Sequence, residues 1–455
     1  MPKRRRVSRY LAATGLSVSM AVAAGRAPTP HYDLVLKGGH VIDPANRIDA
    51  VMDVAIADGK IAAVEGNIPA AEAGKVVDAS GLYVTPGLID IHVHVGNGGA
   101  PLDWYTPAGR AHIQPWGIPA DLFLAYGVTT AVDAGSSGAD TFLALKQLVM
   151  DHSKVRVLAF LNIVADGMSG GLEQDVDQMD VEKCVVTIKE FPEYIVGVKT
   201  AHYWTTKPWD ELHQPWAAVD RAEACGKAVN LPVMFDFWPR PPERSYAELI
   251  LSKMRPGDIH THVFAQQFPI ILENGKVNPI MWEARKRGVI FDVGHGAGSF
   301  WFRNAVPAAE QGFFPDSIST DIHSQSYVAH GVNMIDVMSK FLAMGLPLPE
   351  VIRRSTVNPA REINHPELGT LSPGRPADVA VMELLRGKFG FSDDGYARMD
   401  GTVQLLNRMT IAGGRILYDP SGLSMVEWTK ARKQYFTSPS TGDGPPSRAD
   451  DYPRQ

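Results

Sequence analysis

The central region of the sequence repeats one pattern, an apolar strand followed by an amphipathic helix, and this repeat restricts the fold more than any other feature. One strand begins near Val84, and seven more follow at 128–133, 155–162, 195–199, 232–236, 258–264, 289–293 and 317–321. Strands that alternate with helices form parallel sheets. Eight such units across roughly 250 residues are what a closed β/α barrel requires. The sequence therefore predicts an α/β protein with a (β/α)8 TIM-type barrel at 86–358.

The segments that flank this region have a different pattern. Short strands precede it at 33–36, 54–57 and 60–64, and others follow it at 371–381 and 409–417. The dipeptide Asp58-Gly59 indicates a hairpin between two of the early strands. We expect β-units at 26–85 and 359–420 that pair with each other. The C-terminal extension at 421–455 ends in a run rich in Ser, Pro, Gly and Asp, and we expect it to be partly disordered.

Residues 1–25 have the pattern of a signal peptide. Five basic residues and no acidic residue occur there, with a weakly apolar run that has small residues at its end. This run is too short to anchor the chain in a bilayer, and no later segment has about 18 uninterrupted apolar residues. We expect an exported, periplasmic protein of a bacterium whose mature chain has no membrane span. The paired arginines leave both the general and the twin-arginine export routes open, and an uncleaved leader or a misassigned start codon is the alternative.

The composition excludes several classes of protein. With 45% hydrophobic and 21% charged residues, the chain is an ordinary globular protein, neither a filament nor a linker. The net charge of -6, without a basic stripe, argues against nucleic acid as a partner. Cys184 and Cys225 are too few for a disulfide framework or a cysteine-rich zinc site, and the sequence leaves open whether they meet. Any metal ion must therefore be held by His, Asp, Glu or Lys.

Strongly polar residues close several of the central strands, at the end where barrel active sites lie. His92 and His94 are two residues apart on one strand, so both imidazoles project from one face and can share a metal ion. Lys199 ends an apolar strand, where a buried ammonium group is unfavourable. A lysine with a lowered pKa could capture carbon dioxide, and the resulting carbamate could bridge two cations. Pairing with a carboxylate, or extending the ammonium group out to solvent, is the alternative for Lys199.

Two later strands also end in polar residues. His262 closes one strand, and Asp321 closes the last one. A carboxylate at 321 could bind a metal ion and take a proton from water, which are the two requirements of metal-assisted hydrolysis. Capping of the following helix is the alternative for Asp321.

These motifs together resemble those of the amidohydrolase superfamily. The resemblance begins with the segment Pro86-Gly87-Leu88-Ile89-Asp90-Ile91-His92-Val93-His94. More narrowly, the sequence is similar to the dihydroorotase-like deacetylase subgroup of metallohydrolases at 127–136, 196–199, 291–296 and 319–323. In the family, a closing signature like that at 369–378 leads into a small β-sandwich domain formed by the N- and C-terminal segments. The resemblance implies the same domain here.

The resemblance also implies a metal centre. His92, His94 and Asp321 would bind one ion, and a carboxylated Lys199 would bridge to a second ion held by His262. The implied cofactor is zinc or another divalent metal, with two ions expected.

Residue 236 departs from the family pattern. The family has a histidine at the end of strand five, whereas this sequence has Asp236. A carboxylate can bind zinc, but its charge favours a harder cation, so the second site could be altered or absent. His260 is a possible replacement, although a core position suits it better.

Three further residues are candidates for contact with substrate. His295, in the turn after strand seven, could orient the substrate or the nucleophilic water as a catalytic residue, and stabilisation of the loop is the alternative. Arg240 and Arg244 could pair with a substrate carboxylate, although Glu243 could pair with either of them instead.

The resemblance implies a metal-dependent amidohydrolase that acts on a small-molecule amide or ester. The expected reaction is hydrolysis of a carbon–nitrogen bond, most typically of an N-acyl (deacetylase-type) amide, by a metal-activated hydroxide with Asp321 as proton shuttle. A cyclic-amide (dihydroorotase-like) hydrolase or an ester or lactone hydrolase is the alternative, and a non-catalytic binding homologue is a further one. The sequence leaves a homo-oligomer open.

Overall fold

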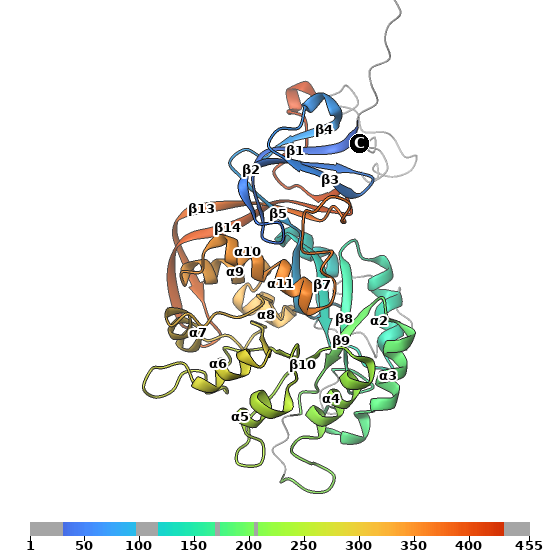
Figure 1. Cartoon of the computed structure of the whole chain (residues 1–455), viewed down its shortest axis with the longest axis vertical. Coiled ribbons are helices and arrows are strands. Elements are labelled where there is room, and N and C mark those ends of the chain that lie inside the picture. Colours follow the sequence, from blue (N-terminus) through green and yellow to red (C-terminus); the bar gives the residue numbers. More distant parts are fainter. Residues whose placement is uncertain (1–30, 97–116, 169–172, 204–207, 432–455) are drawn as a thin grey trace, which may run out of the picture.

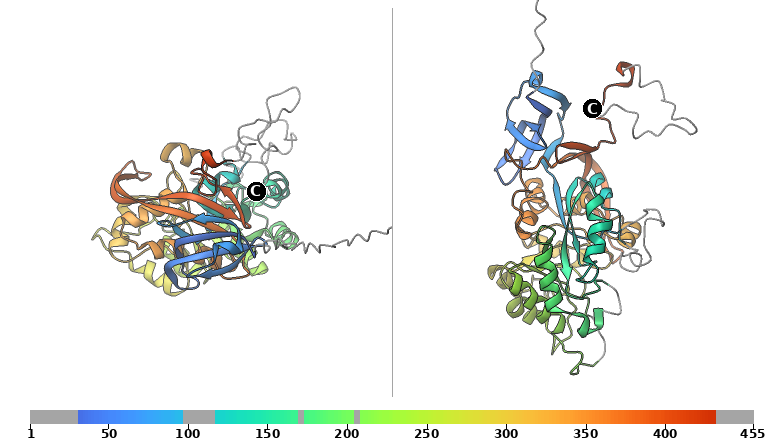
Figure 2. Two further views of the ribbon diagram at one scale, coloured as in Figure 1. Left: turned by 90° about the horizontal axis from the view of Figure 1, so that it is seen from above. Right: turned by 90° about the vertical axis from the view of Figure 1, so that its right-hand side faces the viewer.

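The computed structural model describes residues 31–96, 117–168, 173–203 and 208–431. These residues form a barrel with a β domain at one end, as two further views confirm (Figure 1, Figure 2). The expected signal peptide at 1–25 and most of the C-terminal extension lie outside the described residues. In the part of the chain that is described, no helix has both the length and the apolar character needed to cross a bilayer.

Seven parallel strands form the barrel sheet, in the order β12-β11-β10-β9-β8-β7-β6. They are β6 (Leu88–Val93), β7 (Val128–Ala134), β8 (Arg156–Asn162), β9 (Ile195–Lys199), β10 (Val233–Phe235), β11 (Ile259–His260) and β12 (Ile290–Phe291). The segment 317–322 closes the barrel, because Ser317 bridges in parallel to Asp292 and Ile322 bridges to Val93. The predicted (β/α)8 TIM-type barrel is confirmed, and its eighth strand is reduced to these bridges.

Helices lie around the barrel and against the end where its strands begin (Figure 1). They are α2 (Phe142–Leu148), α3 (Val181–Glu190), α4 (Ala217–Val229), α5 (Tyr246–Glu248), α6 (Pro279–Lys286), α7 (Phe302–Glu310), α8 (Ser324–His330), α9 (Met334–Ala343), α10 (Leu348–Arg354) and α11 (Val357–Glu362). Local sequence sets several of their ends. The Asp180 side chain accepts from the N–H of Lys183 at the start of α3, and Asn230 ends α4 in the left-handed conformation. The largest apolar core lies between these helices and the strands.

The barrel interior is apolar where the strands begin. Side chains from β6, β8 and β10 pack there with residues of α11 and the segment after it, including Ile89, Leu158, Met234, Ala360 and Ile363. The residues that the sequence predicted as metal ligands lie toward the opposite end of the strands, where the strands finish.

The two terminal segments form one β domain, as predicted. Its strands are β1 (Tyr32–Asp43), β2 (Ile48–Ala57), β3 (Lys60–Glu65), β4 (Ala73–Asp78), β5 (Tyr83–Pro86), β13 (Val379–Ser392), β14 (Arg398–Ala412) and β15 (Arg415–Tyr418). The order is β15-β14-β13-β5-β1-β2-β3, with β4 on β1, so β5 joins the N-terminal and C-terminal parts. The predicted hairpin at Asp58-Gly59 is also found, and both residues have positive φ, of 52° and 72°.

Three local features differ from the expected pattern. The strand expected near Val84 divides at Gly87 into β5 and β6, and a Cβ at Gly87 would lie 2.1 Å from Thr129 Oγ1. The expected boundary after residue 358 lies inside α11. The late strands are longer than expected, because β13 and β14 form a hairpin that runs beyond the β domain. The hairpin packs on α9, where Leu405 N–H donates to Ser339 Oγ at 3.0 Å.

Candidate metal centre

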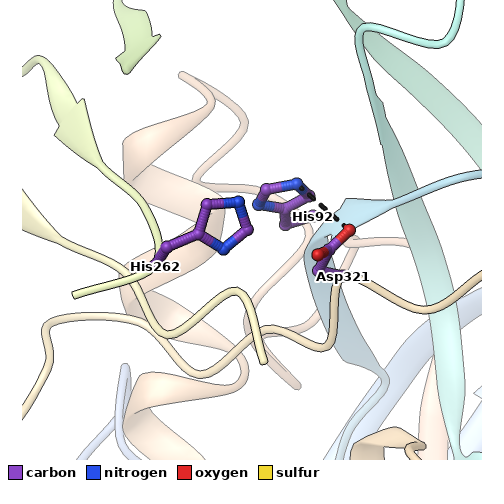
Figure 3. A group of neighbouring side chains, drawn as sticks. All are labelled: His92, His262 and Asp321. Carbon is purple, nitrogen blue, oxygen red and sulfur yellow. Dashed lines mark ion pairs between the residues drawn. The ribbon is translucent and has the colours of Figure 1, made fainter. Parts of the chain in front are cut away.

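Buried polar side chains collect at the end of the barrel where its strands finish. Figure 3 shows His92, His262 and Asp321 facing one another there. Their ligand atoms all lie within 4.8 Å of one another, and no other group of three or more His, Cys, Asp or Glu residues in the described segments does the same. The three residues come from β6, from the residues after β11 and from the segment that closes the barrel.

A chain of hydrogen bonds fixes which nitrogen of His92 faces this centre. Thr261 Oγ1 donates its only hydrogen to Asp292 Oδ2 at 2.8 Å, so in the 2.7 Å contact with His92 Nδ1 the ring nitrogen must be the donor. Burial lowers the pKa of His92 well below its usual value and keeps the ring neutral. Nε2 therefore carries a lone pair, and it faces Asp321 Oδ1 at 3.5 Å. This is the form of histidine that binds metal ions.

His94 approaches the same carboxylate. Its Nε2 lies 3.0 Å from Asp321 Oδ1, while its Nδ1 lies 2.9 Å from Ser136 Oγ. Burial alone would raise the pKa of Asp321, but the surrounding imidazoles of His92, His94 and His262 outweigh burial and lower it below its usual range. Asp321 is therefore an ionised carboxylate between two imidazole Nε2 atoms.

The backbone holds Asp321 in this position. Asp321 has a φ of 46°, in the left-handed region that few residues other than glycine adopt, and its N–H donates to His92 O at 2.6 Å. Beside it, a Cβ at Gly296 would lie 2.3 Å from Asp321 Oδ2, so only glycine leaves room for the carboxylate. Such conformations are typical of functional sites.

A second polar group surrounds Asp236, just after β10. Asp236 Oδ2 lies 3.2 Å from Lys199 Nζ and 3.2 Å from His262 Nε2. Burial raises the pKa of Asp236, but the charges of Lys199, His202 and His262 outweigh burial and lower it well below its usual value. Lys199 is fully buried and pairs with this carboxylate, which is the alternative to carboxylation that the sequence left open.

His202 also belongs to the second group, and the sequence reasoning missed it. Its Nε2 contacts Asp236 Oδ2 at 2.7 Å, and its Nδ1 contacts Glu173 Oε2 at 3.3 Å. Burial lowers the pKa of His202, but the two carboxylates outweigh burial and raise it to about 10. His202 lies three residues beyond the end of β9, so strand periodicity does not apply to it. The only signal in the sequence was a histidine close behind a strand-ending lysine.

His295 takes no part in the hydrogen bonds and ion pairs that join the described residues of the two groups, although its neighbour Gly296 lies against Asp321. Its ring is fully buried and stacks on Phe300, with 4.7 Å between the ring centroids. Lys340 Nζ donates to His295 Nε2 at 2.7 Å, and His295 Nδ1 donates to Gly296 O at 3.1 Å. Protein groups therefore occupy both ring nitrogens. A catalytic role for His295 stays a prediction, which this arrangement does not favour.

Arg240 and Arg244 are likewise held by other protein groups. Arg244 is buried, donates to Tyr203 O and lies over the ring of Phe237 at 4.4 Å. Arg240 lies over the ring of Trp209 at 4.0 Å. Binding of a substrate carboxylate by either arginine stays a prediction.

The residues that the sequence predicted as metal ligands fall into two neighbouring groups. The first contains His92, His94 and Asp321, the second contains Lys199 and Asp236, and His262 lies between them. Imidazole nitrogens and carboxylate oxygens are the ligands that divalent zinc and similar ions prefer. In addition, Asp236 Oδ1 is buried and has no hydrogen-bond partner among the described residues. These residues fit a divalent metal ion.

Comparison with known proteins gives extended matches to enzymes. None of the protein-family models matches the chain. The chain is 30% identical to a deacetylase of Brucella anthropi over 368 residues, which cover 79% of this chain and 85% of the deacetylase. It is 29% identical to a deacetylase of Enterococcus faecalis over 392 residues, or 85% of this chain and 99% of that protein. A shorter match, 52% identical over 67 residues, links 15% of this chain to 16% of a dihydroorotase of Citrifermentans bemidjiense.

Solved structures with the same fold include two enzymes. A crystal structure of an adenine deaminase matches with a TM-score of 0.73 and 27% identity, covering 85% of this chain and 100% of that chain. A crystal structure of a dihydroorotase matches with a TM-score of 0.69 and 26% identity, covering 85% of this chain and 99% of that one.

Proposed function

The chain belongs to the amidohydrolase superfamily and is a metal-dependent hydrolase of carbon–nitrogen bonds in small molecules, and from this premise we propose that its substrate is an N-acyl compound. The similarity to two deacetylases supports an N-acyl substrate, because each match spans most of this chain and most of the deacetylase. A dihydroorotase sequence matches only 15% of this chain, and the solved dihydroorotase that covers 85% of it is 26% identical, below the 29–30% of the two deacetylases, which makes a cyclic amide the weaker candidate.

One observation carries the proposal: the ionised carboxylate of Asp321 lies between the Nε2 atoms of His92 and His94. A divalent ion supplies Lewis acidity, polarising a carbonyl oxygen and making water more acidic. His92 and His94 would hold such an ion with their inward nitrogens. Asp321 would take a proton from the attacking water and pass it to the amine nitrogen as the carbon–nitrogen bond breaks. The products would be a carboxylate and an amine.

Further details of this centre belong to the same proposal. We propose zinc at the first group, since two imidazoles suit it, and a carboxylated Lys199 in the form of the enzyme that binds two ions. We also propose cleavage of residues 1–25 and export to the periplasm, on the grounds of their basic and apolar composition.

A substrate panel tests the proposed activity. The zinc-loaded protein should release amine from N-acetyl amines or N-acetyl amino acids faster than it opens cyclic amides, cleaves aryl esters or deaminates adenine. Asp321→Asn should lower turnover by about 10²–10⁴-fold, because it removes the proton acceptor. Metal content must be measured beside the rate, since Asp321 is also a proposed ligand.

Each contrary result points to a different alternative. Turnover of a cyclic amide or an ester without turnover of any N-acyl compound would move the substrate to that class. Unchanged turnover in Asp321→Asn would exclude the proton shuttle. A metal-loaded protein that turns over nothing in the panel would favour the non-catalytic binding homologue.

A further inference from the structure

Three nitrogen atoms converge on a single oxygen of Asp236. His202 Nε2 is 2.7 Å from Asp236 Oδ2, and Lys199 Nζ and His262 Nε2 are each 3.2 Å from it. His262 Nδ1 donates to the carbonyl oxygen of Gly294, so its Nε2 is the nitrogen that faces this point. Two imidazole nitrogens and a buried amine therefore contact one carboxylate oxygen, beside the group formed by His92 and Asp321. The ligand atoms of His202, His262 and Asp236 are spread more widely than those of the three residues in Figure 3, which all lie within 4.8 Å of one another.

Several contacts hold His202 in this position. Its backbone N–H donates to Glu173 Oε1 at 3.1 Å, and its carbonyl oxygen accepts from Gln174 Nε2 at 2.5 Å. The next carbonyl along the chain, that of Tyr203, accepts from the buried Arg244. These contacts restrain the loop on both sides of the His202 ring.

The Nδ1 atom of His202 is held as well. It lies 3.3 Å from Glu173 Oε2, and the Glu173 side chain is buried. Histidines that bind zinc typically have one ring nitrogen on the metal and the other on a carboxylate or carbonyl group. The carboxylate fixes the ring and makes the metal-binding nitrogen more basic. His92 and His262 have corresponding anchors in Thr261 and the carbonyl of Gly294.

The remaining oxygen of Asp236 is unpartnered. Asp236 Oδ1 is buried and accepts no hydrogen bond among the described residues, although buried carboxylate oxygens are nearly always paired. A structural ion pair between His202 and Asp236 explains the contact at Oδ2, but it leaves Oδ1 unexplained. A cation held by His202 and His262 would account for Oδ1 as well if both oxygens of Asp236 bind it.

We infer that His202 is a ligand of the second metal ion and supplies the imidazole that residue 236 lacks. This inference builds on the metal centre of the proposed function. With His202 and His262 together, the second site would have two imidazole ligands beside Asp236, each of which gives up any proton on its inner nitrogen when the ion binds. The site should then prefer zinc, rather than the harder cation expected from Asp236 alone.

Metal stoichiometry of the full-length protein tests the inference without any substrate. After equilibration with buffered zinc, the wild type should hold two equivalents by elemental mass spectrometry. His202→Gln should hold one, because the amide can still donate a hydrogen bond to Asp236 but is a poor zinc ligand. Glu173→Gln should keep the second ion with an affinity lowered by about 10–100-fold, the usual effect of losing the group behind a ligand.

A matched control and a relocated histidine sharpen this test. His213→Ala removes another histidine between β9 and α4, one that pairs with Asp210 at 3.0 Å, and should leave two equivalents. The double variant His202→Gln, Asp236→His moves an imidazole to residue 236 and should recover the second equivalent. A double variant that stays at one equivalent would overturn the claim that the two positions are interchangeable.

Two results would overturn the inference as a whole. One is a second zinc ion of unchanged affinity in His202→Gln, which would leave His202 as an ion-pair partner of Asp236. The other is a wild type that holds one equivalent at saturating zinc. A protein that binds two ions through His202 but hydrolyses no N-acyl compound would instead refute only the proposed substrate.

Discussion

At the scale of single residues, the hydroxyl of Thr261 decides which nitrogen of His92 faces the metal centre. Thr261→Val keeps the shape of the side chain but removes the group that accepts from His92 Nδ1. We predict a first-site zinc affinity lowered by about 10–100-fold, measured by competition with a chromophoric chelator. His92→Ala should abolish zinc binding at that site, and it gives the affinity expected when the ligand is lost altogether. An unchanged affinity in Thr261→Val would show that packing alone orients the ring.

The sequence predicted most of the residues in the two groups, because they follow strand ends and strands have a fixed period. That rule fails where the backbone leaves the strand. β11 ends at His260, and His262 then has a φ of 59°, so the two side chains do not share a face. His260 packs against the rings of Tyr246 and Phe268 in the core. The position of His202 depends on tertiary contacts with Glu173 and Asp236, which no local pattern encodes.

At the scale of elements, α3 and α4 bring the two cysteines together. Cys184 and Cys225 are buried, with their Sγ atoms 2.7 Å apart. We predict that diamide, which takes up the two electrons and two protons, converts these thiols into a disulfide inside the folded chain. Intact mass spectrometry should show the loss of two hydrogen atoms. The closed loop should stabilise the protein by about 4 kcal/mol, measured by urea unfolding.

Cys184→Ser provides the control for this prediction. The variant should keep its mass and its unfolding midpoint after diamide treatment. Alkylation of both wild-type cysteines after the same treatment and unfolding would contradict the prediction. An oxidised pair in protein isolated from the periplasm would also agree with the proposed export.

The sequence was a good guide to elements that alternate regularly and a poor one to elements defined by long-range contacts. β9 has the bounds that its apolar run predicts, Ile195–Lys199. In contrast, the eighth barrel strand consists of two isolated bridges, from Ser317 to Asp292 and from Ile322 to Val93. The length of the hairpin formed by β13 and β14 comes from its packing on α9, far away in the sequence.

At the scale of the whole molecule, this hairpin connects the β domain to the functional end of the barrel. Its tip supplies Asp393, which accepts from the N–H of Phe302, and Asp394, which accepts from the N–H of Phe300 at 2.8 Å. Phe300 in turn stacks on His295, the residue that precedes Gly296 beside Asp321. The terminal segments therefore help to position a loop that lines the metal centre.

Asp394 should make the stability of the whole protein depend on pH. Burial raises its pKa from 3.8 to about 7, despite the opposing charge of Lys340 and the hydrogen bond from Phe300. His330 Nε2 and His295 Nδ1 also face the carboxylate, at 3.7 and 3.8 Å. Because the folded state holds this proton more tightly than the unfolded state, the stabilisation is complete below about pH 4 and is lost as the pH rises through about 7.

Asp394→Asn should remove this dependence, because the amide oxygen can still accept from Phe300 but carries no charge at any pH. We predict that the free energy of unfolding of the wild type, relative to the variant, falls between pH 5 and pH 8. The largest fall that the full titration of Asp394 can produce is about 4 kcal/mol. Urea unfolding of both proteins at the same free zinc concentration measures the difference at each pH. A difference that stays constant from pH 5 to pH 8 would mean that Asp394 remains ionised in the folded protein, with the charges of Lys340 and His330 outweighing its burial.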